Sequence, residues 1–206
     1  MNEKARRHIA VEGCIGAGKT TLARGLAGAL QGSALIEESG KHPFIHDFYT
    51  APDAFALETE ITFVLLHYHQ MVRELPKLSG IVVSDFALER DFVFARLNLR
   101  VPQEEALFRQ IYSFAKARTS AIDTLIYLRA PIDFLAQRIS KRGREYESRI
   151  TRGYLVSLNA ALERFFVEEY NGPKVIVDAP ELDEAKNPQY VKSVLRRLPP
   201  YSRAES

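Results

Sequence analysis

The stretch "VEGCIGAGKTTLARGL", residues 11 to 26, decides the fold of this chain. Residues 13–20 match the pattern G-x-x-x-x-G-K-[ST] in full, with an apolar run before them and a helical pattern after them. Glycines let such a loop close around phosphate oxygens, and the following helix presents its positive end to them. The stretch therefore predicts a phosphate-binding loop between a strand and a helix, rather than a glycine-rich turn with a surface lysine.

The chemistry of such a loop gives its residues separate roles. We expect Lys19 to bridge the β- and γ-phosphates of a nucleotide and Thr20 to ligate Mg²⁺. The other residues expected to contact the nucleotide are Gly13, Cys14, Ile15, Gly16, Ala17, Gly18 and Thr21. A thiol at a helix N-terminus can be reactive, but no second cysteine is present, so we interpret Cys14 as a small filler.

Beyond the loop, short apolar runs alternate with helical patterns. We predict strands at 8–13, 33–38, 80–85, 124–129 and 174–179, and helices at 20–30, 53–75, 104–118, 131–141 and 150–170. Strands that are apolar on both faces indicate a parallel sheet covered on both sides, so the class is α/β and doubly wound. We expect one domain over residues 1–206 with a loose tail at about 198–206.

Composition excludes several classes of function. The formal net charge of +2 is too small for a nucleic-acid or membrane footprint, and no apolar run reaches membrane-spanning length. A single cysteine and the lack of a leader pattern favour a cytoplasmic setting. His42, His46, His67 and His69 form no metal-binding motif, so Mg²⁺ with the nucleotide is the only metal expected.

A second informative stretch is "QRISKRGREYESR", residues 137–149. Arg138 and Arg142 share a helical face, and Arg144 follows a flexible glycine. Mobile arginines that close over a triphosphate stabilise the charge of phosphoryl transfer. Alone the stretch would indicate a solvated helix end, but with the phosphate loop it predicts a short arginine-rich lid at about 142–148.

Together these segments resemble the deoxynucleoside kinase family, the deoxyguanosine, deoxyadenosine and deoxycytidine kinases, and bacterial members above all. The resemblance runs from about residue 8 to 179 and includes "IEESGKHPFIHDFY", "ETEITFVLLHYHQM" and "VVSDFALERDFVFA". It implies a P-loop kinase fold with a five-stranded parallel sheet, a homodimer, and transfer of the γ-phosphate of Mg²⁺-ATP to a deoxynucleoside 5′-hydroxyl.

The resemblance also implies roles for single residues. Glu38 matches the general base, with Glu37 as the alternative, and Lys19, Arg142 and Arg144 stabilise charge. Tyr49 and Glu147 match groups at the sugar 3′-hydroxyl, and Asp91 matches an aspartate near the base. Asp178 opens the segment that covers adenine, Arg138 joins the nucleotide site, and Asp85 lies near Mg²⁺ and the acceptor.

Two departures concern the acceptor. Glu58 stands where many members carry a base-reading glutamine; a carboxylate offers only acceptors, which favours a guanine-like purine. After the third predicted strand the family carries an arginine, but here the residue is Phe86, and Arg90 could reach inward from a helix. Two alternatives follow: a nucleoside monophosphate kinase like thymidylate kinase, and a nucleotide-binding module without chemistry.

Overall fold

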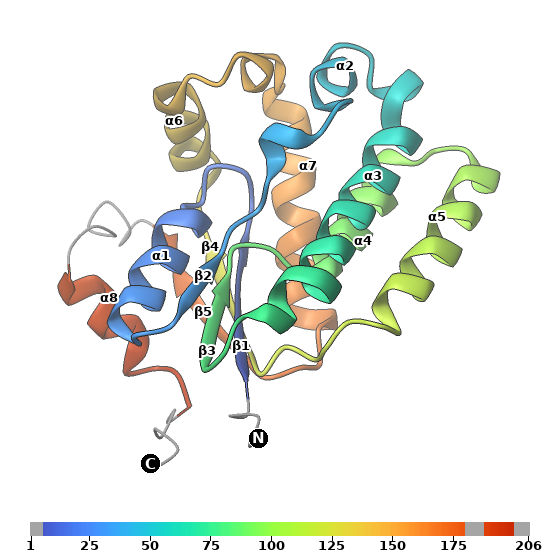
Figure 1. Ribbon diagram of the computed structural model, residues 1–206. Coiled ribbons are helices and arrows are strands. Elements are labelled where there is room, and N and C mark those ends of the chain that lie inside the picture. The colour runs from blue at the N-terminus through green and yellow to red at the C-terminus, as the bar shows by residue number, and fades with distance from the viewer. Residues whose placement is uncertain (1–5, 180–187, 200–206) are drawn as a thin grey trace.

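Five parallel strands form one sheet in the order β2-β3-β1-β4-β5, which confirms the predicted class (Figure 1). The structure, a computed structural model, describes residues 6–179 and 188–199. The strands are β1 (Arg7–Gly13), β2 (Ser33–Leu35), β3 (Ile81–Ser84), β4 (Thr124–Arg129) and β5 (Lys174–Asp178). In the central pairs, Ile9 of β1 lies opposite Val83 of β3, and Val11 lies opposite Ile126 of β4.

Helices cover both faces of the sheet. They are α1 (Lys19–Ala29), α2 (Ile45–Thr50), α3 (Pro52–His69), α4 (Leu88–Asn98), α5 (Pro102–Lys116), α6 (Ile132–Arg142), α7 (Arg152–Glu163) and α8 (Pro188–Leu195). Figure 1 shows α1 and α8 on one side, and α3, α4, α5 and α7 on the other. Wider turns at Gln70–Glu74 and Arg164–Glu169 extend α3 and α7.

Local signals set the helix ends. Proline occupies the first position of α3 and of α5, where its missing N–H costs nothing. Gly143 ends α6 in the left-handed region at φ 66°, and Thr151 caps α7 by accepting a hydrogen bond from Tyr154 N. These ends fix where the segment between α6 and α7 leaves the body of the protein.

Three features differ from the sequence-based expectation. Strand β2 ends at Leu35 rather than at 38, because Glu37 N donates to Asp85 Oδ1 at 2.7 Å instead of continuing the ladder. For α4, the sequence suggested only that a helix could begin at residue 86. Its buried Glu89, Arg90 and Asp91 interrupt the pattern of apolar residues that would otherwise indicate a helix. Helices α2 and α8 were not predicted.

The core lies between the sheet and its helices. Tyr127 and Phe166, both fully buried, stack with ring centroids 5.4 Å apart and join β4 to the end of α7. The carboxyl ends of the strands face α2 and the segment after α6, at the end of the sheet opposite the N-terminus (Figure 1). Within the described ranges, no helix is both long enough and apolar enough to cross a bilayer.

Candidate active site

The loop after β1 has the backbone that a phosphate cradle needs. Gly16 and Gly18 adopt φ values of 85° and 99°, a conformation that residues other than glycine rarely adopt. A Cβ on Gly13 would lie 2.7 Å from the Leu128 carbonyl oxygen, so β4 approaches the loop too closely for any side chain there. The loop closes through a hydrogen bond of 3.1 Å from Ala17 N to Cys14 O.

Two side chains of this loop, those of Lys19 and Cys14, are defined by their hydrogen bonds and their burial. Lys19 Nζ donates to Gly13 O at 2.9 Å and to Cys14 O at 3.1 Å, so its ammonium is held over the loop. Cys14 is fully buried, and burial raises the pKa of its thiol to about 11. A buried thiol with a raised pKa is unreactive, which agrees with its interpretation as a filler.

A basic groove runs from this loop to α6. It is lined by Gly16, Gly18, Lys19, Thr20, Thr21, Arg24, Ile36, Glu37, Ser39, Gly40, Asp85, Gln137, Arg138, Lys141, Arg142 and Arg144. Five arginines and lysines in addition to Lys19 therefore face the space in front of the phosphate loop. A polyphosphate is the ligand that such a groove suits.

Thr20 and Asp85 offer a place for a magnesium ion in this groove. Thr20 Oγ1 donates to Asp85 Oδ2 at 2.5 Å, which brings the two expected metal ligands together. Both supply hard oxygen atoms, and Mg²⁺ needs few protein ligands because water and phosphate complete its octahedron. The donor set fits Mg²⁺, while in the described part of the chain no group of three or more His, Cys, Asp or Glu side chains is arranged to hold a metal ion by itself.

The predicted lid is folded against α2. Arg142 Nε donates to Glu147 Oε2 at 2.9 Å, and Arg144 Nη1 donates to the Tyr146 hydroxyl at 3.0 Å. The Tyr146 ring stacks on Tyr49 of α2, with centroids 5.9 Å apart and an interplanar angle of 11°. The structure thus brings the lid arginines, Glu147 and Tyr49 close together.

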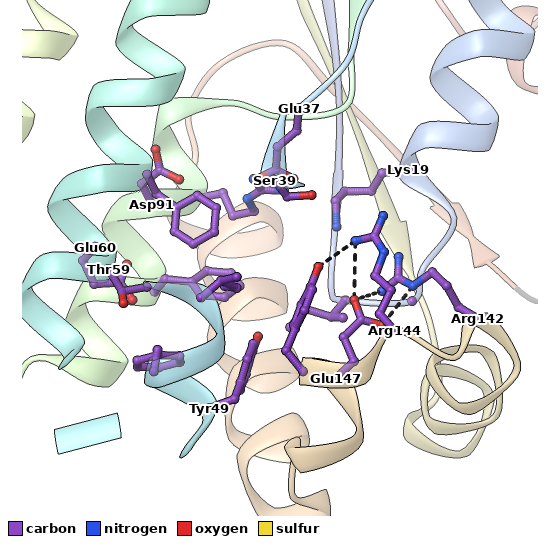
Figure 2. Close-up of a pocket in the computed structure, with 18 residues that line it drawn as sticks. Lys19, Glu37, Ser39, Tyr49, Thr59, Glu60, Asp91, Arg142, Arg144 and Glu147 are labelled. Atoms are coloured by element: carbon purple, nitrogen blue, oxygen red, sulfur yellow. Dashed lines mark hydrogen bonds and ion pairs between the residues drawn. The ribbon is translucent and has the colours of Figure 1, made fainter. Parts of the chain in front are cut away.

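A cavity lies beside the groove and shares several lining residues with it. Lys19, Arg142 and Arg144 lie at one side of it, and Glu60 and Asp91 lie at the other (Figure 2). The remaining lining residues are Ile15, Gly16, Glu37, Ser39, Ile45, Phe48, Tyr49, Thr59, Phe63, Arg90, Phe94, Tyr146 and Glu147. The cavity is cationic near the groove and acidic at its far end.

Glu37, rather than Glu38, is the carboxylate of this site. Arg90 Nη2 donates to Glu37 Oε1 at 2.7 Å, and His67 Nε2 lies 3.2 Å from the same oxygen. Burial would by itself raise the pKa of Glu37, but Arg90 and His67 hold it well below its usual range. The structure does not bring Glu38 into the site, since its side chain is 46% exposed and pairs with Lys41 at 2.8 Å.

His67 connects this carboxylate to Asp91. Its Nδ1 lies 2.7 Å from Asp91 Oδ2, and its ring stacks on Phe86 with centroids 4.5 Å apart. Burial alone would lower the pKa of His67, but Asp91 and Glu37 raise it to about 9. His67 is therefore an imidazolium at neutral pH that donates to both carboxylates, and Phe86 forms the wall behind it.

Glu60, rather than Glu58, faces the cavity from α3. Glu60 is 1% exposed and accepts a hydrogen bond of 2.7 Å from Asn98 Nδ2 at Oε1, whereas Glu58 is exposed to solvent. Residues two apart on a helix point in different directions, and the buried residues Ala56, Glu60 and His67 follow the helical repeat. That repeat is the signal in the sequence that separates Glu60 from Glu58.

Asp178 lies apart from these groups. It accepts a hydrogen bond from Arg129 Nε at 2.8 Å on the surface and lines neither the groove nor the cavity. The segment expected to cover adenine, 178–184, lies mostly outside the described residues. The structure therefore leaves the predicted role of Asp178 without further support.

Comparisons with known proteins agree with one another. The sequence model of the deoxynucleoside kinase family matches residues 9–198. The chain is 30% identical to a deoxyguanosine kinase of Bacillus subtilis over 153 residues, which is 73% of each chain. It is 27% identical to a deoxyadenosine kinase of Lactobacillus acidophilus, over 92% of this chain and 94% of the relative. The deoxyadenosine kinase from M. mycoides with products dCMP and a flexible dCDP bound superposes with a TM-score of 0.80, at 25% identity over 92% of this chain and 97% of that one.

Proposed function

Because the chain belongs to the deoxynucleoside kinase family and is an ATP-dependent kinase, we propose that it transfers the γ-phosphate of Mg²⁺-ATP to the 5′-hydroxyl of a purine deoxynucleoside. One observation carries the proposal: Glu37 and Lys19 line both the basic groove and the cavity beside it. A donor in the groove and an acceptor in the cavity would meet between these two residues.

The groove supports the donor half of the reaction. Lys19 and the loop amides would hold the β- and γ-phosphates, and Thr20 and Asp85 would hold Mg²⁺, which would neutralise charge on the transferred group. Arg142 and Arg144 line both spaces, so the lid can supply guanidinium groups to the phosphoryl oxygens during transfer.

The cavity supports the acceptor half. Glu37 lies where a 5′-hydroxyl would approach the γ-phosphate, and as a carboxylate it would accept the proton that this hydroxyl loses. Arg90 holds Glu37 in place, and so provides the guanidinium that the sequence lacks at Phe86. Tyr49 and Glu147 are candidates for the sugar 3′-hydroxyl, and Asp91 and Glu60 lie at the far end, where the base would fit.

We further propose that two chains associate through α3 and α5. Leu65 is 52% exposed on α3, and Leu107 and Phe114 are 45% and 54% exposed on α5. The centroid of the Phe114 ring lies 6.2 Å from that of Tyr68, and Tyr68 follows Leu65 by about one turn of α3. These side chains therefore form a continuous apolar face across both helices. Such a face is suited to an identical partner by two-fold symmetry.

A single set of assays tests the reaction. Labelled γ-phosphate of ATP would be offered with each deoxynucleoside, ribonucleoside and nucleoside monophosphate, using wild type, Glu37→Gln and Glu38→Gln. We expect label on purine deoxynucleosides and a fall in kcat of about 10² to 10⁴ for Glu37→Gln. Glu38→Gln should behave as wild type, because the Glu38 side chain pairs with Lys41 and lines neither the groove nor the cavity.

Other outcomes would point to other functions. Turnover of monophosphates alone would indicate a nucleoside monophosphate kinase. Tight nucleotide binding with no transfer to any acceptor would indicate a regulatory nucleotide-binding module. Equal activity of Glu37→Gln and wild type would remove the proposed role of Glu37 while leaving the reaction itself intact.

A further inference from the structure

The Glu60 carboxyl group has one oxygen paired and one unpaired. Oε1 accepts the hydrogen bond from Asn98 Nδ2, and Asn98 is itself held 3.2 Å from the Tyr154 hydroxyl. Oε2 is buried and has no hydrogen-bond partner among the described residues. Glu60 lines the acidic end of the cavity, so a base bound there is the group that we expect to pair with Oε2.

The surroundings of Glu60 disfavour a negative charge. Arg90 on α4 is committed to Glu37, and Asp91 on the same helix adds a second carboxyl group nearby. The neighbours on α7 and α2, Tyr154 and Tyr49, are neutral phenols whose pKa values burial raises further. A buried carboxylate with an unpaired oxygen is costly, whereas the neutral acid needs only one acceptor for its proton.

We propose that Glu60 meets the nucleobase as a neutral carboxylic acid, which donates a hydrogen bond from Oε2 while Oε1 remains with Asn98. This inference rests on the proposed function and deepens it. Burial, and to a smaller extent Asp91, raise the pKa of Glu60 to about 8, against the opposing effects of Asn98 and Arg90. The acid then presents the same donor as a glutamine amide whose oxygen accepts from Asn98.

The protonation state selects between purines. The neutral acid offers a donor, which suits the ring nitrogen acceptor N1 of adenine. The ionised form offers only acceptors, which suit N1–H and the amino group of guanine. As pH rises through 8, the enzyme should therefore lose preference for deoxyadenosine and gain preference for deoxyguanosine.

The test measures the ratio of kcat/KM for deoxyadenosine to that for deoxyguanosine from pH 6.5 to 9. We expect this ratio to fall roughly tenfold in wild type, which corresponds to one mismatched hydrogen bond. In Glu60→Gln the ratio should stay at the low-pH value of wild type at every pH. Glu58→Gln is the matched control on the same helix, with its side chain in solvent, and should follow wild type.

Binding measurements separate this inference from the proposed function. Calorimetric titration of both deoxynucleosides over the same pH range should show the same change in relative affinity, whether or not phosphate is transferred. A ratio that is independent of pH in wild type would overturn the inference, even if Glu60→Gln fails to fold. An equal pH dependence in Glu60→Gln and wild type would overturn it as well.

Discussion

Arg90 is a buried cation that serves a carboxylate on another element. Its guanidinium leaves α4 and donates to Glu37, which lies in the segment after β2, at 2.7 Å. Burial alone would lower the pKa of Arg90, but Glu37 and Glu12 raise it, so it stays charged. A fixed charge at this point orients Glu37 and favours its ionised form before the acceptor arrives.

Replacing Arg90 with methionine should therefore impair the chemical step. We expect kcat to fall about 10- to 100-fold, from the loss of one charge-assisted hydrogen bond, with a smaller change in KM for the deoxynucleoside. Arg96→Met on the same helix is the control, because Arg96 pairs with Glu169 at the surface. A change confined to KM, in a variant whose circular dichroism matches wild type, would contradict the assignment.

Single residues were the part of the site that the sequence located least well. It pointed to segments that line the cavity, but it chose Glu38 beside Glu37 and Glu58 near Glu60. The first choice depends on where β2 ends. That end is set by Asp85, which follows the neighbouring strand β3 and accepts a hydrogen bond from Glu37 N. The second needs only the helical repeat of α3, so that information was present in the sequence.

At the scale of elements, the phosphate loop packs closely against β4. Replacing Gly13 with alanine should lower the free energy of unfolding by about 3 kcal/mol, since its φ is 153° and the new Cβ would meet the Leu128 carbonyl. The matched control is Gly28→Ala in α1, where nothing lies within 4 Å. That change should stabilise the protein by about 0.5 to 1 kcal/mol, measured by urea unfolding.

The two substitutions together discriminate between explanations. If Gly13→Ala were as stable as wild type, the close approach of β4 would not constrain the loop. If both variants were destabilised alike, the cause would be a general sensitivity of this region to added volume.

Elements were predictable where a local signal exists. All five strands lie where they were predicted, although β2 is shorter, and the helices that follow loop, proline and glycine signals agree with the structure. Helix α4 carries buried Glu89, Arg90 and Asp91, whose partners come from other elements, so its apolar pattern is interrupted. Such a helix becomes evident only when Glu37 and His67 are placed beside it.

At the scale of the whole molecule, the apolar face of α3 and α5 should determine the oligomeric state. We expect wild type to sediment as a dimer and Leu65→Glu with Phe114→Glu to sediment as a monomer, because two buried carboxylates would oppose association. Val156→Glu on α7 is the control, since Val156 is 44% exposed but lies on another helix. A monomeric wild type, or a dimer that persists in the double variant, would exclude this interface.

The position of Arg90 bears on how relatives of this chain are sorted into working enzymes and pseudoenzymes. An alignment column records where a Cα atom lies, while chemistry depends on where a long side chain ends. A guanidinium stands at the end of a long flexible stem, so an arginine a few residues further along the chain can bring its charge to the same point. Homologues that carry an aromatic residue at the expected column and an arginine four residues later should be assayed before they are set aside as inactive.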